Sequence, residues 1–304
     1  MRLSDRHEAF AALHESGCFV IPNPWDAGSA RMMAALGAKA LATSSAAHAF
    51  TLGRPDMGGV SRDEALAHAA DLLAATGLPV SGDFEDGFGP APGDVAETVR
   101  RAGEVGLSGC SIEDTVMAPG NPAHGFGAAV ERVRAGVAAA RALGRPFVFC
   151  ARADGVMNGA YDLAEGIRRL QAFEAAGADL LYLPVPPGRA ELAQVLAAVR
   201  KPVNALAAGP LKAMSVAELV QVLAAVSKPV NALAAGPLRG LGVADLAAMG
   251  VRRISTGSQI ARVTHAAIRE AVAAMLDEGS FAPLMRAAPG DEIDALLLRG
   301  AAVE

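Results

Sequence analysis

The stretch Gly82-Asp83-Phe84-Glu85-Asp86-Gly87-Phe88-Gly89 places three carboxylates within four residues, directly after the apolar run 78–81. The run is typical of a buried strand, and the glycines after it are typical of a loop. Carboxylates this close together repel one another unless a cation or hydrogen-bond donors lie among them. On an extended backbone Asp83 and Glu85 point to one face and Asp86 to the other. The stretch therefore predicts a strand that ends either in a solvated acidic turn or in a Mg²⁺ site, because Mg²⁺ takes one or two protein carboxylates plus waters.

The same succession of a short apolar run and a helical pattern recurs along the whole chain. Repeated strand–helix units favour a parallel sheet, and eight such units favour a closed (β/α)8 TIM-type barrel. The alternative is an open doubly wound sheet, but no Gly-x-Gly-x-x-Gly follows any expected strand. The expected strands are residues 18–23, 39–43, 78–81, 109–114, 146–152, 178–184 and 251–256, together with a strand in an internal repeat.

The internal repeat joins residues 191–211 and 218–238, which differ at only two of 21 positions. Each copy reads as a helix followed by a Pro-Val-Asn-Ala-Leu strand, and the chain contains eight strand–helix units when one copy is counted. A ninth strand would change the tilt, register and diameter of a barrel together. We therefore expect eight strands to close the barrel, with one copy outside it or distorting that side. Asn204 and Asn231 occupy the same place in the two copies, and at most one of them is expected to line the mouth.

Composition narrows the class of protein. The 304 residues suffice for one large barrel, and 52% of them are apolar but only 4% aromatic, which favours helices packed on a sheet of small and branched side chains. The net charge of −5, with no basic block, argues against nucleic acid as a partner. No apolar run is long enough to span a membrane, and the N-terminus lacks the apolar core of a signal peptide. Three cysteines in apolar runs are expected to be free thiols in a cytoplasmic protein.

Further polar residues follow other expected strands. Ser44 lies in a loop of small residues, Glu113 ends the fourth strand and Arg152 ends the fifth. In a barrel the carboxyl ends of all strands meet at one mouth. Asp83, Glu85 and these residues are therefore expected to converge there, which favours a functional site over a solvated turn.

Several motifs in this order resemble those of the phosphoenolpyruvate mutase/isocitrate lyase superfamily. The resemblance covers nearly the whole chain. It implies an α/β barrel with Mg²⁺ at the strand ends, a bound 2-oxo acid, and a last helix exchanged between subunits of a homodimer or homotetramer. The motifs are NPWDAGSARM (23–32), ATSSAAHAFTLGRPD (42–56), GDFEDGFG (82–89), SIEDT (111–115), FVFCARADG (147–155), AGADLLYLP (176–184), PVNALA and GVRRISTGS (250–258).

The resemblance assigns the acids to a metal. Asp83 matches the direct ligand of Mg²⁺, for which Mn²⁺ is an alternative, and Glu85, Asp56 and Glu113 match acids that hold metal-bound waters. Asp56 and Glu113, together with Arg152, are the expected catalytic residues. The plain alternatives are that Asp56 is an ordinary turn acid and that Glu113 only pairs with Arg152.

The resemblance also assigns the substrate contacts. Ser44 and the backbone of Ser45 match the turn that binds the substrate carboxylate, and Arg152 matches the arginine that pairs with its oxyanion end. Trp25 is expected either to line the pocket or to pack beside it. Asn231 is the expected contact from the repeat.

The loop 115–127 departs from the superfamily pattern. It contains neither the cysteine of lyase members nor the lysine that follows Glu-Asp in mutases, although Asn121 matches a lid asparagine. We therefore expect a Mg²⁺-dependent lyase that acts on a small 2-oxo (di)carboxylic acid through an enolate, most concretely like an oxaloacetate decarboxylase. The alternatives are a P–C bond enzyme (phosphonopyruvate hydrolase or mutase) and a 2-oxo-acid-binding barrel with little turnover. Residues 1–304 are expected to form one domain, in which helices in 258–304 pack on the barrel or on a neighbouring subunit.

Overall fold

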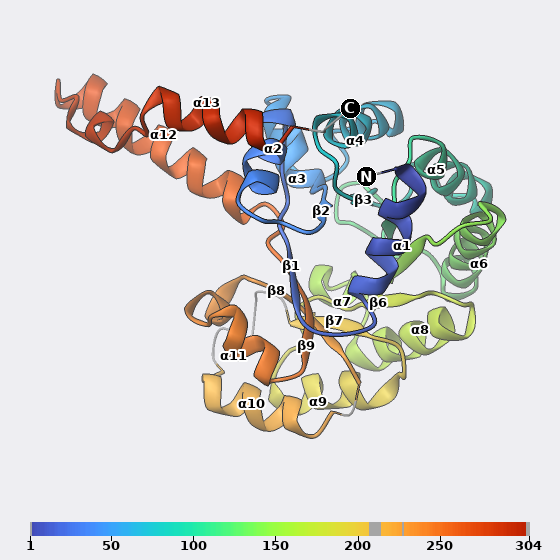
Figure 1. The fold of residues 1–304 in the computed structure, drawn as a ribbon. Coiled ribbons are helices and arrows are strands. Elements are labelled where there is room, and N and C mark those ends of the chain that lie inside the picture. Colours follow the sequence, from blue (N-terminus) through green and yellow to red (C-terminus); the bar gives the residue numbers. More distant parts are fainter. Residues whose placement is uncertain (1, 207–213, 227, 302–304) are drawn as a thin grey trace.

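The computed structural model describes residues 2–206, 214–226 and 228–301. In these ranges nine parallel strands form one sheet in the order β1-β9-β8-β7-β6-β5-β4-β3-β2 (Figure 1). The expected α/β-barrel class is thereby confirmed. The strands are β1 (Phe19–Ile21), β2 (Leu41–Ala42), β3 (Val80–Asp83), β4 (Gly109–Glu113), β5 (Val148–Arg152), β6 (Leu180–Tyr182), β7 (Val203–Leu206), β8 (Val230–Leu233) and β9 (Val251–Ser255).

Helices connect the strands and form the outer layer (Figure 1). The first helix instead lies at the N-terminal end of the barrel, where His7 Nδ1 is 2.9 Å from Ser108 Oγ, directly before β4. The α-helices are α1 (Leu3–Leu13), α2 (Ala27–Ala35), α3 (Ser45–Thr51), α4 (Arg62–Ala75), α5 (Pro92–Glu104), α6 (Phe126–Ala142), α7 (Gly155–Asn158), α8 (Leu163–Ala175), α9 (Arg189–Ala198), α10 (Val216–Ala224), α11 (Val243–Ala248), α12 (Gln259–Asp277) and α13 (Gly290–Arg299).

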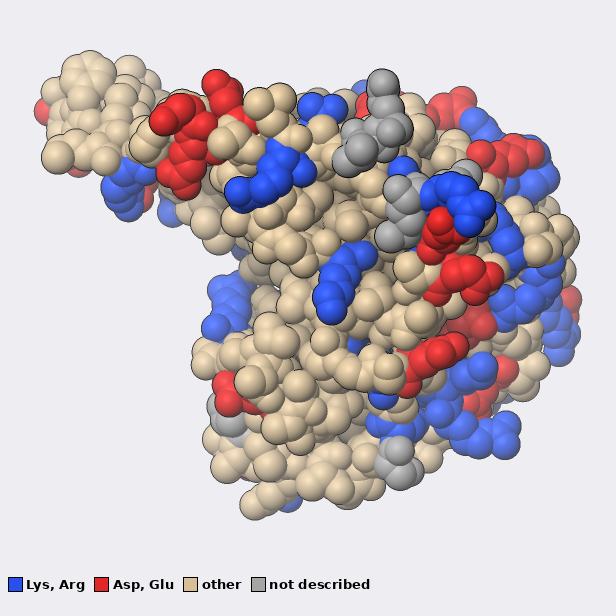
Figure 2. All heavy atoms as spheres, in the orientation of Figure 1, with Lys and Arg blue, Asp and Glu red and all other residues tan. Residues whose placement is uncertain are grey.

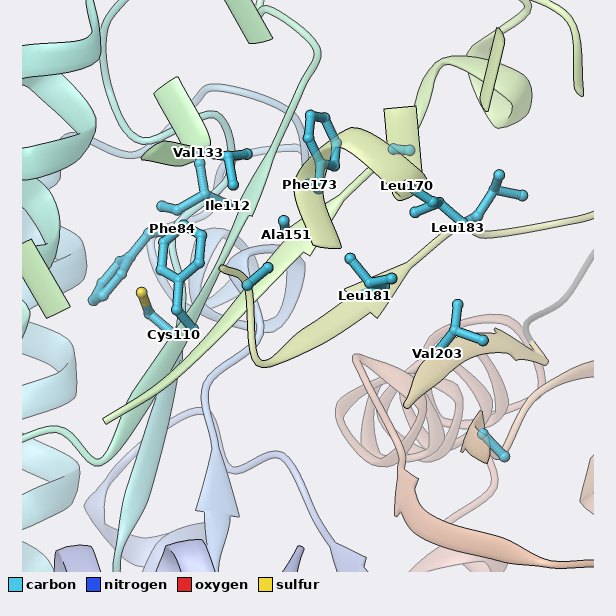
Figure 3. Close-up of a cluster of buried hydrophobic side chains, with 14 of the residues drawn as sticks. Phe84, Cys110, Ile112, Val133, Ala151, Leu170, Phe173, Leu181, Leu183 and Val203 are labelled. Atoms are coloured by element: carbon cyan, nitrogen blue, oxygen red, sulfur yellow. The ribbon is translucent and has the colours of Figure 1, made fainter. Parts of the chain in front are cut away.

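The hydrophobic core lies between the sheet and these helices (Figure 3). Cys110 and Ile112 of β4 are buried in it, and Ile112 faces Val133 of α6. Because successive side chains of a strand point to opposite faces, Ser111 and Glu113 point into the barrel. The alternating side chains of β4 therefore pack in the hydrophobic core on one face of the strand and line the barrel interior on the other.

Both copies of the repeat lie in the sheet, so the expectation that only eight strands close the barrel is wrong. The first copy forms α9 and β7, the second forms α10 and β8, and the two strands pair in parallel. A copy outside the sheet would leave the N–H and C=O groups of its strand without partners. Insertion of a whole helix–strand unit satisfies these groups and covers the strand. Residues 207–211 and 227 of the repeat lie outside the described residues.

The ninth strand is accompanied by irregular pairing on both sides. The register of β7 against β8 shifts between Asn204 and Leu206, and that of β8 against β9 shifts between Val230 and Asn231. Strand number and stagger are linked in a barrel. We infer that the two shifts accommodate the additional strand.

The ends of the sheet meet between β1 and β2. The backbone N–H of Ala42 donates to the carbonyl of Pro22 at 3.1 Å. The buried Asn23 reinforces this junction, because its Nδ2 donates to the carbonyl of Thr43 at 2.9 Å and its Oδ1 accepts from the backbone N–H of Thr256 at 3.0 Å. One side chain therefore ties β1 to the ends of β2 and β9.

The two C-terminal helices form an arm (Figure 1). The first of them, α12, leaves the barrel, and α13 returns along it to pack beside α2 of the same chain. Large apolar side chains of the arm are exposed, among them Val263, Ile268 and Leu276, and its outer end carries few charged groups on the face shown in Figure 2. No helix in the described ranges is long and apolar enough to cross a membrane.

Candidate active site

The strand ends bring the predicted acids and arginine together. Asp83 of β3 is in register with Ser111 of β4, and Glu113 of β4 is in register with Arg152 of β5. Because these strands are parallel and adjacent, their last side chains lie at one mouth of the barrel. The structure thus places Asp83, Glu113 and Arg152 in one site, which the sequence had predicted from three separate motifs.

Asp83 is held by donors on two sides. Its Oδ2 accepts from the backbone N–H of Ser45 at 3.1 Å and from Ser45 Oγ at 2.9 Å. Its Oδ1 accepts from Ser111 Oγ at 3.1 Å and from Arg152 Nη1 at 3.3 Å. These contacts fix the orientation of the carboxylate that the sequence assigns to the metal.

Arg152 lies among three carboxylates. Its Nη2 is 2.9 Å from Glu113 Oε1 and 2.6 Å from Asp154 Oδ2, and its Nη1 is 3.3 Å from Asp83 Oδ1. Its guanidinium also stacks over the ring of Tyr182, with the Cζ atom 4.8 Å from the centroid. Burial alone lowers the pKa of Arg152, but the three acids raise it well above its usual value, so the cation is permanent.

Burial disfavours the charged forms of Glu113 and Glu85. Burial raises the pKa of Glu113 well above its usual value despite the neighbouring Arg152. Burial also raises the pKa of Glu85 to about 7, and the charges of Asp83 and Asp56 add to this effect. A backbone N–H, that of Gly58, donates to Glu85 Oε1 at 3.1 Å. Glu113 is thus paired with Arg152, whereas no cationic side chain pairs with Glu85 among the described residues.

Asp56 lies at the edge of this acidic group, on the exposed loop 51–59. Its Oδ1 accepts from the backbone N–H of Met57 at 2.9 Å, as in an ordinary turn. Partial desolvation nevertheless raises its pKa, and Asp83 raises it further. The structure shows the turn contact of Asp56, and its catalytic role stays a prediction.

The donor set fits a Mg²⁺ ion held mainly through water. Among the described residues, no three His, Cys, Asp or Glu side chains lie in a group that could bind a metal directly. Mg²⁺ keeps several waters and takes one or two carboxylates, so it needs no such group. Asp83 can supply the direct ligand, and Glu85 and Glu113 can hold the waters.

The two serines have structural partners at this site. Ser44 Oγ accepts from the backbone N–H of Ala47 and caps the N-terminus of α3. Ser45 binds Asp83 through both its N–H and its Oγ. Ser44 borders the central cavity, whereas Ser45 orients the proposed metal ligand. Trp25 lies away from the cavity and lines an outer groove with His48.

The site opens into a cavity of about 140 Å³ inside the barrel. Asp83, Arg152, Tyr182 and Asn204 are among the residues that line it. The buried Asn231 lies in register with Asn204 but is not among the cavity-lining residues. Of the two repeat copies, the first one therefore contributes its asparagine to the lining.

Loop 115–124 covers one side of the mouth. An antiparallel bridge joins Thr115 and Ala123, and the backbone N–H of Met117 donates to Asp86 Oδ2 at 3.2 Å. Asp86 thereby holds the loop in place and takes no part in the group around Asp83. Asn121 lies at the tip with a left-handed backbone, φ +41°.

Sequence reasoning missed the residues that position the predicted ones. Thr43 Oγ1 accepts from the backbone N–H of Asp83 at 2.7 Å. Asp154 makes a two-point contact with Arg152, and its own N–H donates to Asp114 Oδ1 at 2.9 Å. The spacing Arg-x-Asp at 152–154 was the available signal for Asp154. No pattern marks Thr43, because its role depends on the pairing of β2 with β3.

The fold and the site together define an α/β-barrel protein with a cluster of acids and one arginine at the carboxyl ends of its strands. The chain belongs to the phosphoenolpyruvate phosphomutase family, whose model matches residues 10–222 and 214–276. The resemblance inferred from the motifs is thus confirmed. The second match begins at the second copy of the repeat, as expected when one unit of the family pattern is present twice.

Three relatives illustrate the range of the family. The chain is 31% identical to the 2,3-dimethylmalate lyase of Eubacterium barkeri over 58% of this chain and 62% of that protein. It is 32% identical to the oxaloacetate decarboxylase of Paraburkholderia xenovorans over 63% and 64% of the two chains. The matches span less than two thirds of either relative. A solved structure from Burkholderia cenocepacia J2315, described only at the level of lyase/mutase, is 43% identical over 96% of this chain and 95% of its own, with a TM-score of 0.81.

Proposed function

We propose that this protein is a Mg²⁺-dependent lyase that cleaves a small 2-oxo (di)carboxylic acid through an enolate, most concretely as an oxaloacetate decarboxylase. The observation that carries the proposal is the fixed placement of Asp83 among Glu113, Glu85 and Arg152. Relatives named as lyases and as an oxaloacetate decarboxylase support the same reaction class. Mn²⁺ is the alternative ion.

The residues divide the chemistry between them. When bound, Mg²⁺ supplies a Lewis acid that stabilises the negative charge developing on the 2-oxo oxygen. Asp83 would hold the ion directly, and Glu85 and Glu113 would hold its waters. Arg152 binds the substrate carboxylate or the developing oxyanion, since its planar fork can donate two parallel hydrogen bonds. Asp154 and Tyr182 hold the guanidinium in one orientation.

Loop 115–124 favours a reaction that needs little proton transfer. The loop offers neither a cysteine nor a lysine, and its histidine, His124, has a pKa lowered by burial. When the carboxylate β to the oxo group of oxaloacetate leaves as CO₂, the electron pair of the broken C–C bond forms the enolate of pyruvate, so no proton has to be removed first. P–C bond cleavage and passive binding of a 2-oxo acid remain the alternatives that the test distinguishes.

The test is a turnover panel with Mg²⁺ and with EDTA. Oxaloacetate, phosphonopyruvate and 2-methylisocitrate are each incubated with the wild type, with Asp83→Asn and with a surface control, Asp71→Asn. The proposal predicts Mg²⁺-dependent release of CO₂ and pyruvate from oxaloacetate, lost in Asp83→Asn alone. Turnover of phosphonopyruvate instead would establish the P–C alternative. Oxalate binding without turnover of any compound would establish the binding barrel.

We further propose that the arm mediates a helix-swapped homo-oligomer, a dimer or a tetramer. Support comes from the exposed apolar side chains of the arm, of which Leu276 is 79% and Met285 is 89% exposed. A groove of about 920 Å³ beside α12, lined in part by Phe50 and Val263, offers a surface for a neighbouring arm. Light scattering after gel filtration tests this. A Leu276→Asp/Met285→Asp double variant should be monomeric, and an unchanged oligomer would contradict the proposal.

A further inference from the structure

Three neighbouring strands carry unpaired polar atoms inside the barrel. Asn204 of β7, Asn231 of β8 and Arg253 of β9 follow one another in register. Asn204 Oδ1, both amide atoms of Asn231 and Arg253 Nε are buried without a hydrogen-bond partner. Native proteins pair almost all such atoms with protein, water or a ligand. A row of them in adjacent strands therefore indicates a group that the protein is built to bind.

Arg253 is the charged member of this row. Among the residues that the structure describes, no carboxylate lies within ion-pair distance of its guanidinium. It contacts the thiol of Cys150, whose pKa burial raises to about 11, so the thiol is neutral. The pKa of the nearby Tyr182 is also raised, chiefly by burial. The imidazole of His14 does not offset the charge of Arg253 either. Burial and the charge of Arg253 lower the pKa of His14 to about 4, so this side chain is neutral at pH 7.

Arg152 provides an internal comparison. It lies in the same barrel and is surrounded by three carboxylates at 2.6–3.3 Å. A buried cation without such partners is costly, because desolvation opposes its charge. For Arg152, the three carboxylates of the protein offset this cost of desolvation. Arg253 is partly buried and lines the cavity, and among the described residues no acid lies within ion-pair distance of it.

The unpaired row faces the site already described. Arg253 and Asn204 line the same cavity as Asp83 and Arg152. A molecule bound at the mouth would therefore reach the row with its other end. The cavity volume of about 140 Å³ limits that molecule to a small one.

We propose that Arg253, with Asn204, forms a second anion subsite that binds the carboxylate distal to the 2-oxo end of the substrate. This inference rests on the proposed function and narrows its substrate class to 2-oxo dicarboxylic acids. Arg253 donates to the distal carboxylate, Asn204 donates through its Nδ2, and the first carboxylate stays with Arg152. A 2-oxo monocarboxylic acid leaves the subsite unfilled.

The first test measures binding without turnover. Succinate, with two carboxylates, and acetate, with one, are added to metal-free wild type, Arg253→Met and Arg252→Met during thermal unfolding. Arg252 is the matched control, because it also has buried guanidinium nitrogens without a hydrogen-bond partner but lies on the opposite face of β9, outside the cavity lining. Succinate should raise the melting temperature of the wild type and of Arg252→Met more than acetate does, and this difference should disappear in Arg253→Met. The ligand-free Arg253→Met should be at least as stable as the wild type, whereas a purely structural role predicts that it is less stable.

The second test measures specificity. Loss of a charge-assisted hydrogen bond corresponds to a change of about ten- to a hundredfold in affinity. The KM for oxaloacetate should therefore rise by about this factor in Arg253→Met, while inhibition by oxalate, which reaches only the mouth, stays within about twofold. Arg253→Lys retains the positive charge and should give a KM for oxaloacetate between those of the wild type and Arg253→Met. If Arg253→Met does not fold, the KM of Arg253→Lys provides the test.

The outcomes separate this inference from the proposed function. Turnover of oxaloacetate with an unchanged KM in Arg253→Met would overturn the subsite and leave the lyase intact. No turnover of any 2-oxo acid, with succinate stabilisation that depends on Arg253, would overturn the lyase and support the subsite. The subsite would be overturned, with or without turnover, if succinate stabilised the wild type and Arg253→Met equally or did not stabilise the wild type at all.

Discussion

The charge of Glu85 should destabilise the metal-free protein above neutral pH. Its pKa is raised from 4.5 to about 7, chiefly by burial, and the side chain is only 4% exposed. At about 1.36 kcal/mol per pKa unit, this difference corresponds to about 3 kcal/mol. A carboxyl with a raised pKa in the folded state loses stability as pH rises from 4.5 to about 7 and remains at that lower level above it. Glu85→Gln removes the charge and retains an oxygen that accepts from Gly58.

The assay is urea unfolding of the wild type and Glu85→Gln in EDTA, between pH 4.5 and pH 8. Glu85→Gln should exceed the wild type by up to about 3 kcal/mol at pH 8 and by less than about 1 kcal/mol at pH 4.5. Mg²⁺ should stabilise the wild type more than the variant. The exposed Glu131→Gln controls for the substitution itself. A stability difference that does not vary with pH, or a Glu85→Gln that is less stable at pH 8, would refute the reasoning.

Three further predictions concern stability. Arg152→Met leaves three carboxylates without their cation and should lower the free energy of unfolding by about 3–5 kcal/mol, whereas the exposed Arg168→Met should change it by less than about 1 kcal/mol. Asn23→Ala opens the junction of the barrel ends and leaves buried backbone groups unpaired, so urea unfolding should show a loss of about 3 kcal/mol. Gly109→Ala should cost about 1–3 kcal/mol, because its Cβ would lie 2.5 Å from a carbonyl oxygen, while Gly127→Ala, with open space around it, should cost nothing. Equal losses of stability in Arg152→Met and Arg168→Met, or in Gly109→Ala and Gly127→Ala, would contradict the respective prediction. An unchanged free energy of unfolding in Asn23→Ala would contradict the role of Asn23 at the junction.

The sequence predicted the positions of the site well, because each acid follows a local strand pattern. Asp83, Glu113 and Arg152 end strands that could be recognised one at a time, and the barrel rule then brings those ends together. Local signals of this kind need no knowledge of which strands pair.

The parts that were not predicted depend on pairing across the barrel. Nothing local in residues 191–211 and 218–238 says whether a duplicated unit joins the sheet, since that depends on backbone partners far away in the chain. Ser45 had been assigned to the substrate, but the turn of α3 aims both its donors at Asp83. Arg253 carried no signal either, because its lack of a counter-charge is visible only when its neighbours inside the barrel are known.

The most direct test of the central claim is a calorimetric titration of Mg²⁺ into the wild type, Asp83→Asn and the surface control Asp71→Asn, each in the presence of oxalate. Asp83 is the proposed direct ligand, and the neighbouring glutamates hold only waters. The account predicts saturable Mg²⁺ binding in the wild type and in Asp71→Asn, and loss of that binding in Asp83→Asn. Unchanged Mg²⁺ affinity in Asp83→Asn would contradict the placement of the metal, and with it the proposed chemistry of the site.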